Sequence, residues 1–321
     1  MKREGPAAAR AQGWGRAYFA VQALAGLAWW VGVFLSPAIR TATLGSLDPV
    51  IVAAFDIPLF VIGSAVAALG VRAAAAVATG WTGLVAVSLA AYATITTEAG
   101  WGVLIMLAAA ACSVVALFFM VQGRVPTELM VRGPFAFRPA SNRGGTAGNV
   151  GATIGQLILF WGFFLVVLPS VIKWFEHRWH VTVPFPSAAA PAGLVVLVLA
   201  STLGIASAVT MSSTGRGTPL PSAMPNRLVI AGPYRWVRNP MAVAGISQGA
   251  AVGLMLGSWL VVAYAVVGSL LWNYAVRPPE EADLERRFGA EFQRYRDSVR
   301  CWIPRWRKDL PHRKGRPPFR P

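Results

Sequence analysis

The residues best suited to chemistry flank one long apolar stretch near the C-terminus. Arg238 and Asn239 come just before this stretch, which runs over 241–276, and the acidic pair Glu280 and Glu281 comes just after it. The proline after Asn239 favours a helix start, whose free amides and positive dipole end favour an anionic group. A carboxylate on the opposite side favours a cation. Together these residue types suit a small molecule that carries both an ammonium group and a carboxylate.

The segment before this stretch, 215–241, has too many prolines and glycines in its first half for a regular helix. Irregular backbone at the membrane is tolerated where it lines a cavity or contacts a ligand. Tyr234 and Trp236 in this segment are candidates for stacking on a ring or for contacting a cation. The structural alternatives are an aromatic belt for these two residues and a solvated helix start for the glutamates.

The helices that must position these residues are expected to lie in a membrane. Hydrophobic residues make up 55% of the chain, charged residues 13%, and the mean hydropathy is +0.54. A spanning helix needs roughly 20 mostly apolar residues. Such runs lie near 17–35, 50–70, 77–97, 101–122, 153–172 and 190–210.

The apolar stretch 241–276 is about twice the length of one span. Gly257 and Ser258 near its middle predict a tight turn, and therefore a helical hairpin. The expected fold is all-α: a polytopic integral membrane helical bundle with about eight transmembrane helices. The hairpin is C-terminal, and the cofactor pocket lies on the cytoplasmic side.

Basic residues indicate the orientation, because loops rich in Lys and Arg stay on the cytoplasmic side. They precede the first expected span and follow the second, fourth and sixth, whereas Arg40, Lys173 and Arg178 fall on the opposite side. We therefore expect a multi-pass protein of a bacterial cell membrane with both termini cytoplasmic. Four segments are predicted: a four-span module (1–122), a basic loop plus two spans (123–210), the hairpin region (211–304) and a disordered basic tail (305–321).

The net charge of +16 also bears on partners. The excess lies in the expected cytoplasmic loops and the tail, so anionic membrane lipids are the expected partner and nucleic acid is not. The two cysteines, Cys112 and Cys301, lie too far apart in expected depth for a disulfide. No metal-ligand spacing is present, so we expect no metal.

Residues 218–304 resemble membrane methyltransferases that include isoprenylcysteine carboxyl methyltransferases and phospholipid N-methyltransferases. The family pattern LVxxGPYxxxRHPxYxG is matched by Leu228, Val229, Gly232, Pro233, Tyr234, Arg238, Asn239, Pro240, Met241, Ala242 and Gly245. The pattern EExxLxxxFGxxYxxYxxxVxxxxP is matched by Glu280, Glu281, Leu284, Phe288, Gly289, Phe292, Tyr295, Val299 and Pro304.

The resemblance implies an enzyme, a transferase that uses S-adenosyl-L-methionine and acts on a lipophilic or lipid-anchored substrate. Arg277, near the substrate, and Glu280 are the expected catalytic residues. The expected cofactor-binding residues are Leu228, Val229, Gly232, Tyr234, Arg238, Asn239, Pro240, Met241, Ala242, Glu280 and Glu281.

The chain departs from the family pattern at Asn239, which replaces the usual His, and at Ala242, which replaces a Tyr. Asparagine does not titrate near neutral pH, so residue 239 cannot act as a general base. A carboxylate acceptor needs no deprotonation, whereas an amine must lose a proton. The sequence therefore favours O-methylation of a carboxylate.

Three alternatives stay open. The first is a phospholipid N-methyltransferase. The second is a sterol-type membrane reductase that uses NADPH, because such reductases resemble this family in their C-terminal helices. The third is a transporter or scaffold, suggested by the four N-terminal spans.

Asp56 is a separate candidate, because it lies inside the second expected span beside Pro58. An ionisable group within a span is a functional hypothesis by default. The alternative is a place near the lipid headgroups.

Overall fold

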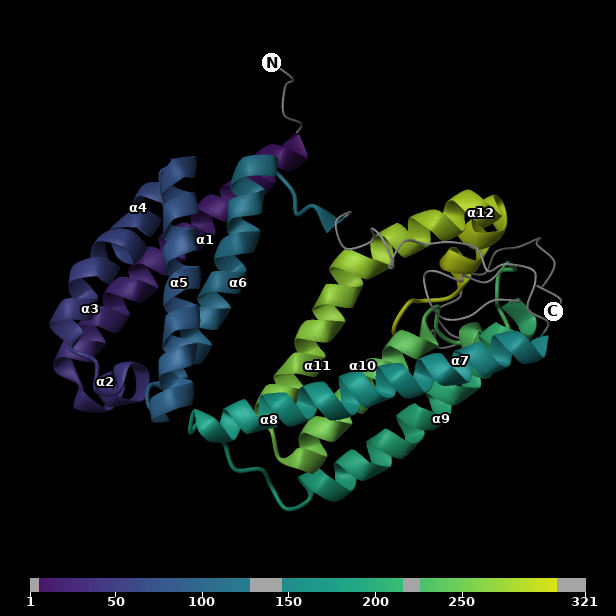
Figure 1. Cartoon of the computed structure of the whole chain (residues 1–321). Helices are drawn as coiled ribbons and strands as arrows, with labels where there is room; N and C mark the ends of the chain where they lie inside the picture. The colour runs from purple at the N-terminus through teal and green to yellow at the C-terminus, as the bar shows by residue number, and fades with distance from the viewer. Residues whose placement is uncertain (1–5, 128–145, 216–225, 305–321) are drawn as a thin grey trace. The chain divides into compact units, whose positions relative to one another are not determined.

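The computed structural model describes residues 6–127, 146–215 and 226–304, and only the backbone of residues 146–150 and 152–154 (Figure 1). Most of the expected basic loop after residue 123, the start of the loop before the hairpin and the tail 305–321 lie outside these ranges. Within them, all regular secondary structure is helical, which confirms the predicted all-α class.

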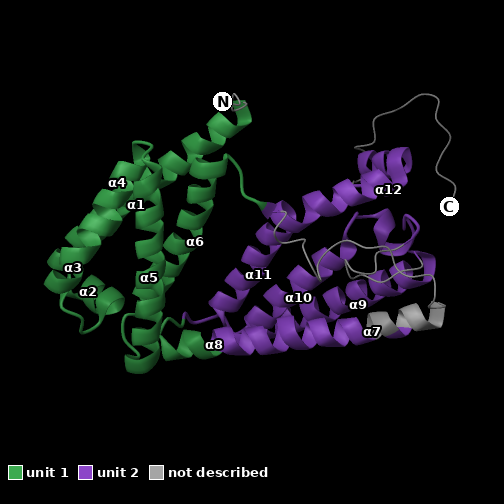
Figure 2. Cartoon of the chain, turned by 45° about the horizontal axis from the view of Figure 1, so that its top comes forward, with its two compact units in different colours: residues 1–126, 174–182 green, residues 127–173, 183–321 purple. Residues whose placement is uncertain are grey.

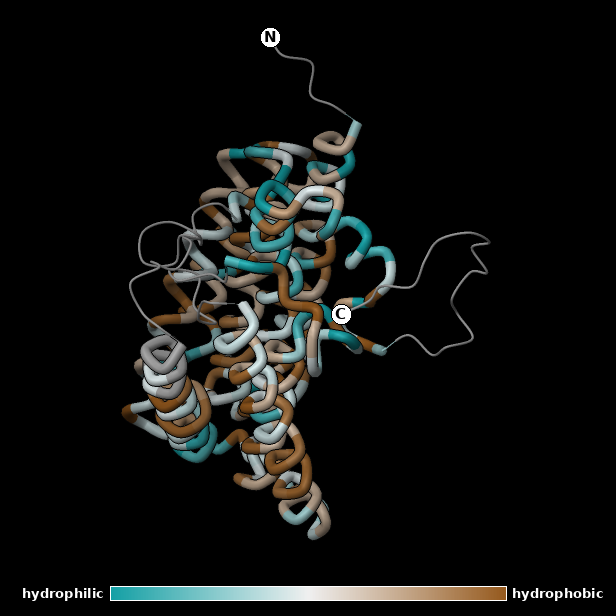
Figure 3. The backbone as a smooth tube through the Cα atoms, turned by 90° about the vertical axis from the view of Figure 1, so that its right-hand side faces the viewer, coloured by the Kyte–Doolittle hydropathy of each residue, from teal (hydrophilic) through white to brown (hydrophobic). Residues whose placement is uncertain are grey.

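Seven helical stretches in the described part of the chain are long and apolar enough to cross a membrane. They are Pro6–Leu35, Pro49–Ala68, Arg72–Thr96, Gly100–Gln122, Gly155–Arg178, Ala189–Gly215 and Trp259–Ser298. An eighth apolar helix, Pro240–Leu256, has 17 residues and is the first arm of the expected hairpin. Hydrophobic residues recur along the length of the helices (Figure 3). The molecule is a polytopic helical membrane bundle, as the sequence predicts.

The chain divides into two compact units (Figure 2). Unit 1 comprises Met1–Pro126 and Trp174–Thr182, and unit 2 comprises Thr127–Lys173 and Val183–Pro321.

Unit 1 is a bundle whose helices approach closely at small residues. Its helices are α1 (Pro6–Leu35), α2 (Pro37–Leu44), α3 (Pro49–Asp56), the π-helical η1 (Ile57–Ile62), α4 (Gly63–Ala68), α5 (Arg72–Thr96) and α6 (Gly100–Gln122). A Cβ atom on Gly102 would lie 2.1 Å from the carbonyl oxygen of Thr43, and one on Gly15 would lie 2.7 Å from that of Ala116. Such contacts let helices pack without a hydrophobic driving force between them.

Unit 2 carries the residues singled out in the sequence. Its elements are α7 (Thr146–Trp161), η4 (Gly162–Val167), the start of α8 (Leu168–Arg178), α9 (Ala189–Gly215), η6 (Gly232–Arg235), α10 (Pro240–Leu256), α11 (Trp259–Leu271), η7 (Trp272–Val276) and α12 (Arg277–Ser298). Helices α9 and α10 lie side by side, and a Cβ on Gly193 would come within 2.8 Å of the Ala251 carbonyl oxygen. Buried Gln248 donates its side-chain amide to Ser201 Oγ at 3.0 Å across this contact.

The predicted turn between the hairpin helices is confirmed. Gly257 ends α10 in the left-handed conformation, with φ +56°, and its N–H donates to carbonyls of the last turn. Ser258 begins α11, and its Oγ accepts the Val261 N–H at 3.2 Å. Both ends of the turn therefore satisfy backbone groups that the helices leave free.

Gly289 bends α12 in its middle. Its φ of +49° and ψ of −125° are open to glycine but strained for other residues. Glu285 and Arg296 form an ion pair at 3.0 Å across the bend. Beyond it, Phe292, Tyr295 and Val299 form a buried cluster against Leu228 and Ile230 of the loop that precedes η6. The bend at Gly289 thus lets the second half of α12 pack against the loop that carries the predicted site residue Leu228.

Substitution Gly289→Ala should lower the free energy of unfolding by about 1 to 3 kcal/mol, because the backbone strain at a positive φ is not offset by any new contact. Thermal unfolding in a neutral detergent measures this loss. Gly155→Ala, at a helical glycine in α7 with open space around it, is the matched control and should be neutral or stabilising. Equal melting temperatures for the two variants would contradict the role given to Gly289.

Candidate functional site

A cavity of about 510 Å³ in unit 2 joins the two ends of the hairpin. This volume is within the range of roughly 300–1,000 Å³ that is usual for small-molecule sites. The predicted site residues on its wall are Leu228, Val229, Tyr234, Arg238, Asn239, Met241, Ala242 and Glu280. The hairpin thus brings Asn239 and Glu280 to one cavity.

Four predicted residues do not line this cavity: Gly232, Pro240, Arg277 and Glu281. Gly232 has a φ of +54°, and a Cβ there would lie 2.7 Å from Thr210 Oγ1 of α9, so only glycine fits this turn. Pro240 is buried at the start of α10. Trp236 also lies off the wall, with 65% of its surface exposed.

Asn239 caps the helix whose N-terminus faces the cavity. Its Oδ1 accepts the Ala242 N–H at 3.0 Å, and its carbonyl accepts the Val243 N–H at 3.2 Å. Pro240 has no N–H to offer. Among the first residues of α10, Met241 therefore has the amide that stays available to an anionic ligand. The start of α10 therefore offers fewer free backbone amides to an anionic ligand than the sequence suggests.

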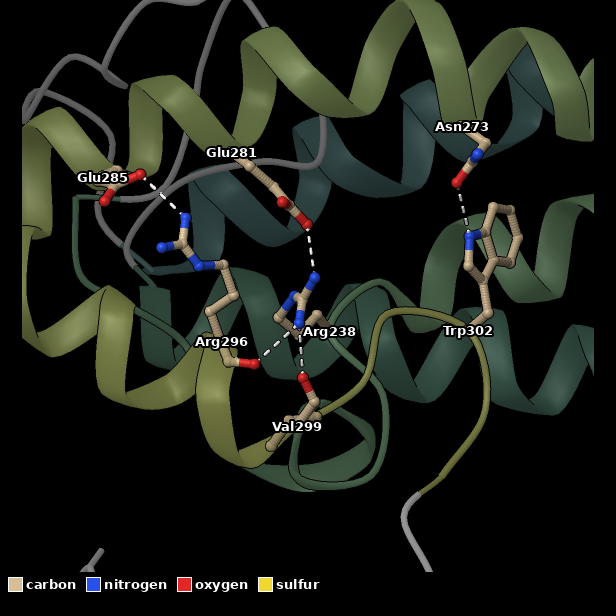
Figure 4. A network of polar contacts seen from close by, with 7 residues as sticks. All are labelled: Arg238, Asn273, Glu281, Glu285, Arg296, Val299 and Trp302. Atoms are coloured by element: carbon tan, nitrogen blue, oxygen red, sulfur yellow. Dashed lines mark hydrogen bonds and ion pairs between the residues drawn. The ribbon is translucent and has the colours of Figure 1, made fainter.

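Arg238 fastens the loop before the hairpin to the end of α12 (Figure 4). Its Nη2 forms an ion pair with Glu281 Oε1 at 2.8 Å, while Nη1 donates to the carbonyls of Arg296 at 3.1 Å and Val299 at 2.7 Å. Its backbone N–H donates to the Arg300 carbonyl at 3.0 Å. Most donors of this guanidinium are thus directed into the protein, so Arg238 and Glu281 act first as positioning residues.

Glu280 differs from its neighbour in having no counter-charge. The side chain is half-buried on the cavity wall, and no hydrogen bond or ion pair from residues 6–127, 146–215 or 226–304 reaches it. A carboxylate taken out of water costs free energy unless a cation or hydrogen-bond donors compensate it. Glu280 is therefore the wall residue best suited to hold a cationic group.

Tyr234 lies buried beside this carboxylate, with its hydroxyl near Met211 Sδ at 3.9 Å. Burial, and secondarily the charge of Glu280, raise the pKa of Tyr234 above its ordinary value. The phenol therefore stays protonated at physiological pH. Tyr295 donates its hydroxyl to the Tyr234 carbonyl at 2.6 Å, which holds η6 against α12.

Arg277 points to the C-terminal segment instead of the cavity. Its guanidinium lies beside the thiol of Cys301. Burial raises the pKa of that thiol, and the charges of Arg238 and Arg277 offset part of the rise. Trp302 anchors the same segment by donating its indole N–H to Asn273 Oδ1 at 3.0 Å (Figure 4). The substrate role of Arg277 stays a prediction.

Sequence reasoning missed the part of the wall contributed by other helices. It includes aromatic and amide side chains of α7, η4, α10, α11 and η7: Gln156, Phe160, Trp161, Phe164, Gln248, Tyr264 and Trp272. No motif marks them. One available signal is Gly249 on α10, because small residues in membrane helices favour a close helix contact, and a Cβ there would lie 3.3 Å from Ala265 of α11.

A comparison with protein families agrees with this location. Residues 189–291, from α9 to the second half of α12, match the family model described as phospholipid methyltransferase. The match covers the cavity walls formed by α9 to α12 and supports a membrane methyltransferase. The comparison with curated proteins and the comparison with solved structures each give no match.

Removing the Arg238 guanidinium should detach the loop from α12. We expect Arg238→Ala to lower the free energy of unfolding by about 2 to 3 kcal/mol, since it leaves Glu281 and two carbonyls without their donor. Thermal unfolding and limited proteolysis around residue 238 measure the effect. Arg286→Ala, which breaks a surface pair with Asp283, is the control and should cost less than about 1 kcal/mol. A result in which Arg286→Ala is the more damaging variant contradicts this role.

Proposed function

We propose that this protein is a membrane methyltransferase that uses S-adenosyl-L-methionine and methylates a lipophilic acceptor. The observation that carries the proposal is the half-buried Glu280 carboxylate, which has no counter-charge among the described residues and faces the capped start of α10 across one cavity. This cavity lies largely within the segment that matches the methyltransferase family. S-adenosyl-L-methionine supplies an activated methyl group together with an ammonium group and a carboxylate.

Different residues of the cavity would hold the different groups of S-adenosyl-L-methionine. Glu280 compensates the ammonium charge, and the Met241 N–H is the amide at the α10 N-terminus that can receive the carboxylate. Apolar wall residues such as Leu228, Val229 and Leu284 exclude water from the rest of the cavity. Arg238, which lies on the wall, and Glu281, which lies off it, hold the loop in place through their ion pair. Catalysis then depends mainly on alignment.

For the acceptor we propose a carboxylate on a lipophilic or lipid-anchored molecule, as in isoprenylcysteine carboxyl methyltransferases. The amide of Asn239 cannot remove a proton, and its oxygen is already used in the helix cap. A carboxylate is anionic at neutral pH and needs no base. A role of Arg277 near the acceptor is part of this proposal, although its guanidinium lies beside Cys301 and off the cavity wall.

A phospholipid amine is the second candidate acceptor, and the description of the matched family favours it. It requires a group that accepts the proton of the amine. Glu280 is the carboxylate on the described wall, and because in this proposal it already pairs with the ammonium group of the cofactor, the proton of the amine passes to solvent. For either acceptor we propose the same membrane orientation. The cavity and both termini lie on the cytoplasmic side, because loops rich in arginine stay on that side. Anionic lipids are the proposed partners of those loops.

Calorimetric titration of the detergent-purified protein tests the cofactor. We expect S-adenosylhomocysteine to bind and Glu280→Gln to weaken it about tenfold or more, through loss of a charge pair with the ammonium group. Glu291→Gln, at an exposed glutamate of the same helix, is the matched control and should bind normally. Binding of NADPH in place of S-adenosylhomocysteine would move the assignment to a sterol-type reductase. Binding of neither would favour a transporter or scaffold.

The chemical stability of the transferred methyl group decides between the two acceptors. Membranes containing the protein are incubated with S-adenosylmethionine labelled in its methyl group, and the lipid extract is treated with mild base. A carboxyl methyl ester releases its label as volatile methanol, which we expect, whereas an N-methyl group keeps it. Label that stays non-volatile after base treatment overturns the carboxylate proposal and supports the phospholipid amine.

A further inference from the structure

Unit 1 contains a buried carboxylate that the proposed function does not use. Asp56 ends α3 inside the span Pro49–Ala68, and 4% of its surface is exposed. Trp30 donates its indole N–H to Oδ2 at 2.8 Å, and Trp81 donates its indole N–H to Oδ1 at 2.8 Å. An indole nitrogen is a donor only, so both carboxylate oxygens accept, which matches the ionised form.

These two donors are neutral and leave the negative charge uncompensated. Within the part of the chain that the structure describes, no Lys, Arg or His forms an ion pair with Asp56. A charged group inside a span is costly and usually pairs with another charge or faces a cavity. Asp56 does face one.

The cavity beside Asp56 has a volume of about 570 Å³, and its wall comes entirely from unit 1. Six aromatic side chains stand on that wall with the carboxylate: Tyr18, Trp29, Phe55, Phe60, Trp81 and Tyr92. Aliphatic residues of α1, α3, α5 and α6 form most of the remainder. The face of an aromatic ring attracts a cation, most strongly where water is excluded.

The backbone at this place departs from the regular α-helix. Pro58 follows Asp56 closely, and residues Ile57–Ile62 form the π-helical turn η1. Pro58 removes one N–H from the helical ladder, and a π turn changes the direction in which the flanking side chains point. Single π turns occur frequently at functional sites. Here the turn begins directly after the buried carboxylate and carries Phe60 of the cavity wall.

We propose that unit 1 binds a lipophilic organic cation, an amine or quaternary ammonium with an apolar tail. Asp56 supplies the counter-charge, the aromatic side chains surround the cationic head, and the aliphatic wall accommodates the tail. A bare metal ion is a poorer fit, because hard cations need several oxygen ligands and Asp56 is the only carboxylate that contributes to this wall among the described residues. The site belongs to another unit than the Glu280 cavity and does not depend on the methyltransferase proposal.

Calorimetric titration of the full-length protein in a maltoside detergent tests this site. The probes share a ten-carbon tail and differ in charge: decyltrimethylammonium, decanol and decanoate, each corrected for its heat of entry into protein-free micelles. We expect saturable binding of the ammonium about tenfold or more tighter than that of the alcohol, and no binding of decanoate. Equal affinities for the ammonium and the alcohol overturn the proposal, because Asp56 then has a structural role alone.

Variants locate the effect in unit 1. Asp56→Asn should abolish the preference for the ammonium over the alcohol, while Asp48→Asn, at an exposed helix cap where asparagine serves equally well, should keep it. Glu280→Gln should also keep the preference for the ammonium. Loss of this preference in Glu280→Gln would place the cation in unit 2 and overturn the proposal. If Asp56→Asn does not fold, the probe series on the unmodified protein decides alone.

Discussion

In a bilayer no water is available for the backbone, so every peptide N–H and C=O must find its partner within the protein. This constraint makes the described chain helical and decides where its helices can end. Gly257 and Ser258 close the hairpin by satisfying groups on both sides of one tight turn. Pro58 and the π turns interrupt the regular ladder only where a cavity wall is formed. The π-helical turns η1, η4 and η7 and the two described cavities therefore occur together.

The same constraint separates the roles of two adjacent carboxylates. Successive residues of a helix point about 100° apart, so Glu280 and Glu281 cannot serve one ligand equally. Glu281 turns to Arg238 and completes a group of contacts that joins the loop to the end of α12. Glu280 turns to the cavity and has no such partner in the described chain. One glutamate of the pair maintains the architecture, and the other is left for chemistry.

The length and spacing of apolar runs made the spans and the hairpin turn predictable from the sequence, because both depend on local composition. The placement of Asn239 and Glu280 on one cavity followed from the hairpin alone. The partners of Arg238 were not predictable, since backbone carbonyls carry no sequence signal and come into reach only through the bend at Gly289. The wall residues of α7 and η4 were missed because tertiary packing, and no motif, brings them there.

The contacts of Arg238 also determine when the site can form during synthesis. Its carbonyl partners come 58 and 61 residues later in the chain, at Arg296 and Val299. While α10 and α11 leave the ribosome and enter the membrane, the loop before them can contact α9 but lacks its anchors at the end of α12. A nascent chain that stops at the end of α11 lacks Glu280, Glu281 and the carbonyls that hold Arg238, so the assembled site requires the chain through α12 and the residues after it.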